Sequence, residues 1–442
     1  MAGNPVLYWL TTRTRDDTKR RNDGLRWEIE RGECSKDVLH QYEALFDIDA
    51  WYEECKHLTF PSVFVQISQP EAIALLDIYS GQNRLHEDVK QLLPRFRFLA
   101  PPDQILADLT ARVNQAMDSI SQRGVPSPGF FVRLSARSPK DSAYGTTRMR
   151  HLLARELLVG SPSEEPAIVS PTWRQNGEFA AFFRAQIASL CVADAGAAID
   201  LLTKSERIYE DLKSALTEAS HLGRWDQKLA IRRWCDHLDI AGEFRCFVFR
   251  KQLAAISQYF HFICFPDLLR FRAEIEAAIR EFFESDVLPI LKWDDCIMDI
   301  LVCFPKTMSA RTPGNTAGSL DRTELKVQII EFNPFTRFTS GCLFSWFDPL
   351  DSAIIHAQQP FEFRLLEAPF DTAQDRDSIE QDFFTLRSRI DPSLQRECAA
   401  LLTLVQEHIQ DDVSRINSNL RYLVRQNQLG MAMVALRNKR KT

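Results

Sequence analysis

Three oxygen-bearing side chains lie in two strand-like segments of the chain. Asp299 sits inside the apolar run 296–302, and Glu331 and Asn333 lie two positions apart in the run 325–333. Because side chains alternate between the two faces of a strand, Glu331 and Asn333 point to the same side. Hard oxygen ligands without His or Cys favour magnesium over zinc. The pattern predicts a magnesium–nucleotide site, and its alternative is that Asp299 and Glu331 pair with lysine or arginine at strand ends.

Two β-rich blocks must position these side chains. The first, residues 244–257, has the pattern of a hairpin whose turn falls near Lys251. The second holds the runs 296–302 and 325–333, separated by a turn rich in Gly, Ser and Thr. An amphipathic helix over residues 271–290 joins the blocks. These patterns predict an α+β fold with mixed or antiparallel sheets.

Composition divides the chain into three parts. Residues 1–37 are polar and predict an N-terminal arm. Residues 38–349 hold the strand-like segments and predict the folded core, whose length allows one large core or two to three packed lobes. Residues 350–442 predict a linker and a helical C-terminal appendage, because helical periodicity and a capping signature, Asp377-x-x-Glu380, follow Asp371.

The composition excludes several classes of protein. Charged residues make up 26% of the chain and nearly cancel to a net charge of −6, so no overall field draws the protein onto nucleic acid or an anionic membrane. The ten cysteines lack the spacing of zinc ligands, which predicts reduced thiols and a reducing compartment. Neither a secretory leader nor a membrane span is expected, so we predict a cytoplasmic protein without a membrane partner. P-loop, hydrolase-elbow and zinc-protease motifs do not occur.

Several motifs follow one another in a fixed order. They comprise RRWC at 232–235, EFRCFV at 243–248, ISQ at 256–258, Asp299, EFNPF at 331–335 and LFSW at 343–346, preceded by FVRL at 131–134 and SPKD at 138–141. In order and spacing they resemble the cell division cycle protein 123 family. The resemblance extends over about three quarters of the chain, from Val38 to Trp346.

This resemblance implies an ATP-grasp-like core that binds ATP and Mg²⁺ between two lobes. The resemblance implies three kinds of role. The phosphates would be contacted by Arg133 and Lys204, with Arg245 nearby, and the hinge that borders adenine would be Leu229, Ala230, Ile231 and Arg232. The magnesium ligands would be Asp299, Glu331 and Asn333. Arg133 replaces a lysine of the family, and guanidinium still forks onto phosphate oxygens. For Arg245, the alternative is a strand arginine paired with Glu243 on the same face.

The sequence departs from the family around the expected cleft. Residues 135–137 and 259–265 replace distinctive family segments, and Arg337 and Ser340 occupy positions that are acidic in the family. A preserved frame with altered surroundings suggests a different ligand. The favoured hypothesis is an enzyme that forms an amide or peptide bond on an amino-acid-derived substrate in specialised metabolism. One version is a synthase of arginine-containing cyclodipeptides that uses aminoacyl-tRNA.

The alternative hypothesis is an ATP-binding assembly chaperone for eukaryotic translation initiation factor 2 that binds its gamma subunit. It requires only nucleotide binding and a docking surface. The basic clusters at 13–21 and 437–441 could contact RNA phosphates if aminoacyl-tRNA were a substrate. Solvated tails are the simpler interpretation of both clusters.

Overall fold

The computed structural model describes residues 42–83, 101–121, 128–143, 146–159, 171–261, 263–304, 325–336, 339–346 and 348–369. The predicted N-terminal arm and most of the predicted C-terminal appendage lie outside these ranges, as does Arg337. Within the described ranges, no helix combines the length and the apolar character that crossing a membrane requires.

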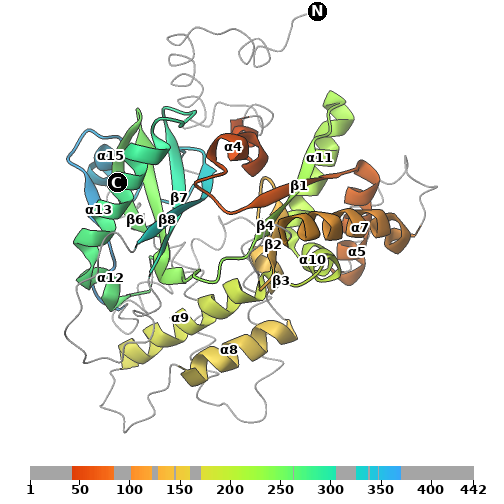
Figure 1. Ribbon diagram of the computed structural model, residues 1–442, viewed down its shortest axis with the longest axis horizontal. Coiled ribbons are helices and arrows are strands. Elements are labelled where there is room, and N and C mark those ends of the chain that lie inside the picture. Colours follow the sequence, from red (N-terminus) through yellow and green to blue (C-terminus); the bar gives the residue numbers. More distant parts are fainter. Residues whose placement is uncertain are drawn as a thin grey trace, which may run out of the picture.

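The first lobe is built on a four-stranded antiparallel sheet (Figure 1). Its order is β1-β4-β2-β3, with bounds β1 Ser62–Ile67, β2 Phe130–Leu134, β3 Cys191–Val192 and β4 Gln227–Arg233. Four helices complete the lobe's apolar core, namely α5 Gln69–Asn83, α7 Pro102–Ser121, α10 Ala195–Leu202 and α11 Glu206–Leu222. The strand β4 is central because it pairs with β1 on one side and β2 on the other.

The second lobe is built on a five-stranded sheet of order β8-β7-β5-β6-β9. The bounds are β5 Glu243–Phe249, β6 Gln252–Gln258, β7 Cys296–Cys303, β8 Lys326–Asn333 and β9 Glu362–Arg364. All neighbours are antiparallel except β6 and β9, so the sheet is mixed. The hairpin turn predicted near Lys251 is confirmed: Arg250 and Lys251 both have positive φ, as a two-residue hairpin turn of type I′ requires. The predicted α+β fold class with antiparallel and mixed sheets is therefore confirmed.

Helices pack on both faces of the second sheet. The predicted helix at 271–290 is present as α13 Arg272–Phe282 and a π-helical turn at Phe283–Val287, and the short helix α12 Pro266–Arg270 precedes it. Alternate residues of β7, such as Met298 and Ile300, share one apolar cluster with α13, whereas Ile297 on the opposite face packs with α15, Pro349–Ile355. The helices α8 Thr147–Val159 and α9 Pro171–Ser189 lie side by side (Figure 1).

The second lobe continues past the predicted core boundary at residue 349. The strand β9 pairs in parallel with β6, and α15 contributes Ile354 and Ile355 to a buried cluster. Residues 350–364 are thus part of the sheet and of the helical layer that packs on it. Without β9, the strand β6 would have an unpaired edge.

A short connection, residues 234–242, links β4 of the first sheet to β5 of the second. It ends in the 3₁₀ turn Ile240–Gly242. A Cβ atom at Gly242 would lie 2.3 Å from the carbonyl oxygen of Val302, so only glycine allows this close approach to β7.

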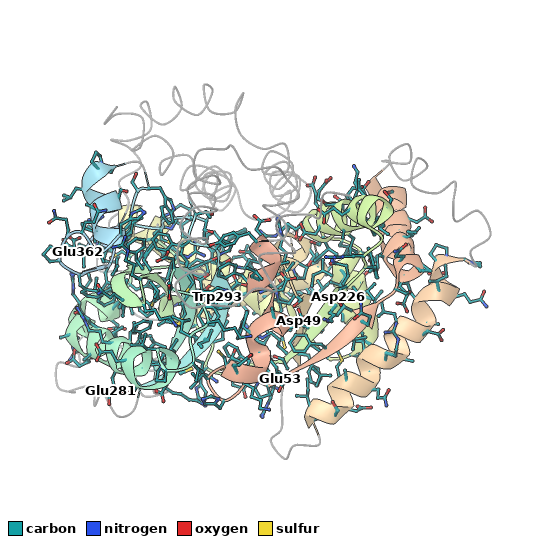
Figure 2. The ribbon with its side chains drawn as sticks, turned by 90° about the horizontal axis from the view of Figure 1, so that it is seen from above. Asp49, Glu53, Asp226, Glu281, Trp293 and Glu362 are labelled. Atoms are coloured by element: carbon teal, nitrogen blue, oxygen red, sulfur yellow. The ribbon has the colours of Figure 1, made fainter. Side chains whose placement is uncertain are left out.

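The helix α4, Ile48–Cys55, follows the 3₁₀ turn Ala44–Phe46 and contacts β8 through Trp51. Trp51 is fully buried, and its ring packs edge-on against Phe332 with centroids 5.1 Å apart. The indole Nε1 donates to the carbonyl oxygen of Phe46 at 3.2 Å. Viewed from above, the neighbouring Trp293 lies near the middle of the molecule, whereas Glu281 and Glu362 lie at the outer end of the second lobe (Figure 2).

Replacing Trp51 with Ala should lower the free energy of unfolding by about 3–5 kcal/mol, because it empties a large buried site. Urea denaturation measures this loss. Trp173 is 42% exposed and supplies a matched control, so Trp173→Ala should change stability by only about 0.5 kcal/mol. Equal losses in the two variants would contradict the packing described for α4.

Candidate functional site

A row of charged side chains crosses three strands of the second sheet. Arg245 on β5 is the direct register partner of Asp299 on β7, and Asp299 is the direct partner of Glu331 on β8. Direct partners in adjacent strands share a face. The three side chains therefore point to the same side of the sheet.

Arg245 and Asp299 form a buried bidentate ion pair. The Nε and Nη2 atoms of Arg245 donate to Oδ1 and Oδ2 of Asp299 at 2.8 and 2.7 Å. Burial alone would lower the pKa of Arg245, but Asp299 outweighs it and raises that pKa well above its ordinary value. The remaining Nη1 atom donates to the carbonyl oxygen of Ser340 at 2.6 Å. Arg245 thus takes Asp299 on the next strand as its ion-pair partner, in place of the alternative partner Glu243.

The three predicted magnesium ligands are brought together. Asn333 donates through Nδ2 to Oδ2 of Asp299 at 3.0 Å, and Glu331 lies beside Asp299 in the register. They present two carboxylates and one amide, and no cluster of three or more His, Cys, Asp or Glu suited to a metal occurs among the described residues. Both oxygens of Asp299 accept hydrogen bonds from protein groups. Carboxylate and amide oxygens are donors that suit Mg²⁺, and the role of these three residues as metal ligands stays a prediction.

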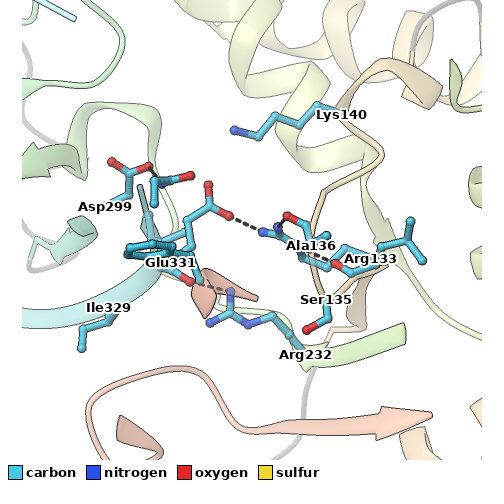
Figure 3. Close-up of polar contacts among 12 residues, drawn as sticks. Arg133, Ser135, Ala136, Lys140, Arg232, Asp299, Ile329 and Glu331 are labelled. Carbon is cyan, nitrogen blue, oxygen red and sulfur yellow. Dashed lines mark hydrogen bonds and ion pairs between the residues drawn. The ribbon is translucent and has the colours of Figure 1, made fainter. Parts of the chain in front are cut away.

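Arg133 reaches this row from β2 of the first lobe. Its Nη1 atom pairs with Oε2 of Glu331, while Nε and Nη2 donate to the carbonyl oxygens of Leu134 and Ala136 at 3.0 and 3.1 Å. Figure 3 shows Arg133 and Glu331 pointing toward one another from facing elements. Burial would raise the pKa of Glu331, but Arg133 and Lys140 outweigh it and lower that pKa to about 2. Glu331 is therefore an anion held between the lobes.

Arg232 on β4 makes a second contact between the lobes. Its Nη1 atom donates to the carbonyl oxygen of Ile330 at 2.8 Å, and Nη2 donates to Oγ1 of Thr59 at 2.8 Å. The register between β7 and β8 shifts by one residue here, so that Ile330 is a bulge. Burial and the nearby Arg133 lower the pKa of Arg232 to about 9. Arg232 therefore holds the strand that carries Glu331.

The segment predicted to border adenine lies in the middle of the first sheet. Leu229, Ala230 and Ile231 are fully buried, and they pair with β1 on one side and β2 on the other. Leu229 and Ile231 pack into the first lobe's core. Only Arg232 of this segment reaches the row, and a role of the other three beside adenine stays a prediction.

Lys204 does not join the row in the structure. It follows α10, and its Nζ atom pairs with Oδ2 of Asp200 at 2.6 Å, four positions earlier. The carboxylate of Asp200, in the last turn of α10, lies within reach of the Lys204 ammonium group. A contact between Lys204 and phosphate stays a prediction.

Three residues of the site were missed by sequence reasoning. The Nζ atom of Lys140 donates to the Tyr259 hydroxyl at 3.0 Å and lies 5.0 Å from the centre of that ring. The guanidinium carbon of Arg245 also lies 5.0 Å from the ring centre, so Tyr259 contacts two cations. Burial would lower the pKa of Lys140, but Tyr259, Glu243 and Glu331 raise it. Figure 3 shows Lys140 pointing toward the space beside Glu331.

Glu243 completes the group. It lies on the same face of β5 as Arg245, two positions away, and burial raises its pKa to about 7. Two signals could have found these residues: Lys140 stands in the SPKD motif, and strand alternation places Glu243 beside Arg245. Tyr259 gave no such signal, because it falls where the sequence departs from its family.

We call this set the inter-lobe cluster. It carries four cationic side chains and three carboxylates, namely Arg133, Lys140, Arg232, Arg245, Glu243, Asp299 and Glu331. The cations outnumber the carboxylates even when every group is charged, and a proton on Glu243 increases the excess. Such a cluster attracts an anion, or a metal accompanied by an anion, more strongly than a bare cation.

Comparisons with known proteins find one family model and several similar proteins. Residues 180–383 match the family model described as D123. Translation initiation factor eIF2 assembly proteins of Candida albicans and Xenopus laevis are each 28% identical to the chain, over 171 and 119 residues. These matches cover 38% and 27% of this chain, and they span less than half of either relative, 44% and 29%. Solved structures of Cdc123 from Schizosaccharomyces pombe, intact and C-terminally truncated, are 18% identical, with TM-scores of 0.44 and 0.45. They cover 73% of this chain, and the matches span 96% and 95% of the respective solved chains.

The antiparallel sheet, the mixed sheet and the polar cluster between them define an α+β protein of two lobes. The resemblance to the cell division cycle protein 123 family that the motifs predicted is confirmed, because the D123 family model matches residues 180–383.

The same comparisons correct the favoured functional hypothesis. The curated relatives are named as assembly proteins, and the comparisons give no support to an enzyme that forms amide or peptide bonds or a cyclodipeptide. The hypothesis rested on altered residues around the cleft, but the altered residue Tyr259 contacts Lys140 and Arg245 within the cluster. Departure from a family motif was therefore a poor guide to a new reaction.

Replacing Glu243 with Gln should change how stability depends on pH. The pKa of Glu243 is about 7 in the folded protein, against an ordinary value of 4.5 for a solvated glutamate, so the folded protein holds a proton that the unfolded chain releases between these values. The free energy of unfolding should therefore fall as pH rises from about 4.5 to about 7, by up to about 1.4 kcal/mol per pH unit. The Gln variant should lack this component.

Urea denaturation at pH 5 and pH 8 measures the difference between Glu243→Gln and the unmodified protein. Glu53 has a side chain that is 74% exposed, so Glu53→Gln should keep the original pH dependence. Identical pH profiles for Glu243→Gln and the unmodified protein would show that Glu243 titrates normally.

Proposed function

We propose that the inter-lobe cluster binds a magnesium nucleotide. The observation that carries this proposal is the convergence of Arg133 and Lys140 from the first lobe on Asp299 and Glu331 of the second. Phosphate oxygens are strong acceptors for guanidinium and ammonium groups, and Mg²⁺ commonly binds proteins through one or two carboxylates together with phosphates.

The roles follow from chemistry and position. Asp299, Glu331 and Asn333 would hold the metal, and Arg133, Lys140 and Arg245 would face phosphate oxygens. Bound Mg²⁺ would supply charge neutralisation for the phosphates. In the structure Arg133 and Glu331 satisfy one another, so both side chains must exchange partners when a nucleotide is present. The cations and carboxylates of the cluster thus neutralise one another until a ligand of matching charge binds.

Magnesium ATP should raise the melting temperature of the protein, because a ligand that binds only the folded state stabilises it by about 2.7 kcal/mol at 100 times its Kd. Glu331→Gln removes one proposed metal ligand and its charge, and it should weaken magnesium-dependent binding at least tenfold. Thermal shift and isothermal titration calorimetry, each with and without Mg²⁺, measure this.

Glu362→Gln is a matched control on the opposite edge strand of the same sheet. Glu362 pairs with Arg364 at 2.8 Å and lies at the outer end of the lobe (Figure 2). It should keep the full nucleotide effect. If Glu331→Gln and Glu362→Gln bind magnesium ATP equally well, Glu331 is not a metal ligand.

We further propose that the chain assists assembly of translation initiation factor 2 by binding its gamma subunit. The D123 match and the names of the curated relatives support this proposal. The matched range, residues 180–383, includes β5, β7 and β8, which carry Arg245, Asp299, Glu331 and Asn333. Nucleotide binding would then fix the relative placement of the lobes on which a docking surface depends.

Purified chain should retain the purified gamma subunit of the initiation factor in a pull-down. Binding should be stronger with magnesium ATP than without nucleotide, and Glu331→Gln should remove most of the nucleotide dependence. Bovine serum albumin serves as the unrelated protein. Failure to retain the gamma subunit under every nucleotide condition would exclude this partner, whereas the thermal-shift result would still decide whether nucleotide binds.

A further inference from the structure

A pair of cysteines lies where the connection between the lobes meets the second sheet. Cys235 is the second residue after β4, and Cys303 is the last residue of β7. Both belong to a small apolar cluster with Phe60, Leu301 and Ile330. The backbone before Cys235 is anchored to the first lobe, because the Trp234 amide donates to the carbonyl oxygen of Gly129 at 3.0 Å. The pair thus spans the two lobes.

The two thiols contact each other and differ in character. A hydrogen bond links their side chains, and both cysteines are free. Cys235 is half-buried, whereas Cys303 is buried, so an oxidant from solvent meets Cys235 first. The hydrogen bond from Cys303 lowers the pKa of Cys235 to about 6 against the effect of burial, and the same contact raises the pKa of Cys303. Cys235 is therefore the nucleophile of the pair, since the thiolate is the reactive form.

We propose that Cys235 and Cys303 are a redox modification site that closes to a reversible disulfide in the presence of hydrogen peroxide. The Cys235 thiolate attacks one peroxide oxygen, the O–O bond breaks, and a sulfenic acid and hydroxide form. Cys303 then gives up its proton and attacks the Cys235 sulfur, which expels the hydroxyl group as water. Two thiols and one peroxide thus yield one disulfide and two waters.

The bond would join the inter-lobe connection to β7. It would close a loop that contains β5, β6, α12, α13 and almost all of β7, and it lies near the place where Arg232 binds the Ile330 carbonyl. A crosslink of this kind restricts the unfolded chain and restrains the lobes in their observed placement. The proposal concerns the connection alone and stands whether or not a nucleotide binds.

Cys191 provides the comparison within this chain. It is also half-buried, but burial raises its pKa, and its Sγ atom lies 3.9 Å from a backbone carbonyl, that of Pro128. Solvent access alone therefore does not distinguish Cys235 from Cys191. The neighbouring thiol of Cys303 makes the difference.

The test uses the full chain, reduced with dithiothreitol, desalted and treated with graded hydrogen peroxide. Remaining thiols are alkylated, and tryptic peptides are sequenced by mass spectrometry. The expected product joins the peptide 234–245 to the peptide 293–306, with fragment ions that place the bond at Cys303 and not at Cys296. Dithiothreitol should reverse it, and Cys191→Ser should form it in equal yield.

A second readout is the melting temperature, which should rise on peroxide treatment of the unmodified protein and return on reduction. Cys235→Ser and Cys303→Ser should each lack the rise. The proposal is overturned if Cys235 advances to sulfinic acid without the 234–245 to 293–306 link, if the link goes to another cysteine, or if Cys303→Ser keeps the full rise.

Discussion

The buried ion pair between Arg245 and Asp299 is the constraint on which the rest of the second lobe depends. Removing two charges from water costs several kcal/mol per ion, and only close geometry with further hydrogen bonds offsets that cost. Both oxygens of Asp299 are satisfied by Arg245, with Asn333 as an additional donor, and the remaining guanidinium nitrogen finds the Ser340 carbonyl. The strands β5, β7 and β8 must therefore keep their register, because a slip of one residue would turn these side chains to the opposite face.

The same row explains how the two lobes are joined. β8 is an edge strand of its sheet, and exposed edges carry unpaired backbone groups. The first lobe and the segment before β1 cover this edge. The backbone amide of Ile329 donates to the carbonyl oxygen of Leu58 at 2.8 Å, and the Thr59 hydroxyl donates to the carbonyl oxygen of Ile329 at 2.6 Å. From the first lobe, Arg133 forms an ion pair with Glu331. The contact surface is polar and charged. Interfaces of this kind exchange partners more readily than apolar ones, which suits the nucleotide site proposed between the lobes.

Sequence reasoning succeeded where periodicity and spacing carry the information. The alternation in 325–333 placed Glu331 and Asn333 on one face, and the ordered motifs indicated the family whose model matches residues 180–383. It failed where the answer depends on distances across the fold. Lys140 and Tyr259 are 119 positions apart in the chain, and nothing in their spacing predicts a hydrogen bond between them. Lys204 was assigned by its resemblance to a family motif, and its local ion pair with Asp200, four positions earlier, was not foreseen. The functional hypothesis failed for a related reason, because substitutions near a site were equated with a changed reaction.

The bulge at Ile330 shows how one extra residue in a strand can link the two lobes without disturbing the sheet. On either side of it the polar side chains of β8 stay on the face of Asp299, while Val327 and Phe332 stay on the other, so omitting Ile330 would leave the amphipathic pattern intact. Only the backbone carbonyl oxygen that accepts a hydrogen bond from Arg232 would be lost. A related chain that lacks one residue at this point could therefore match every other side chain of β8 and still hold its two lobes together differently, because the hydrogen bond to Arg232 would be lost.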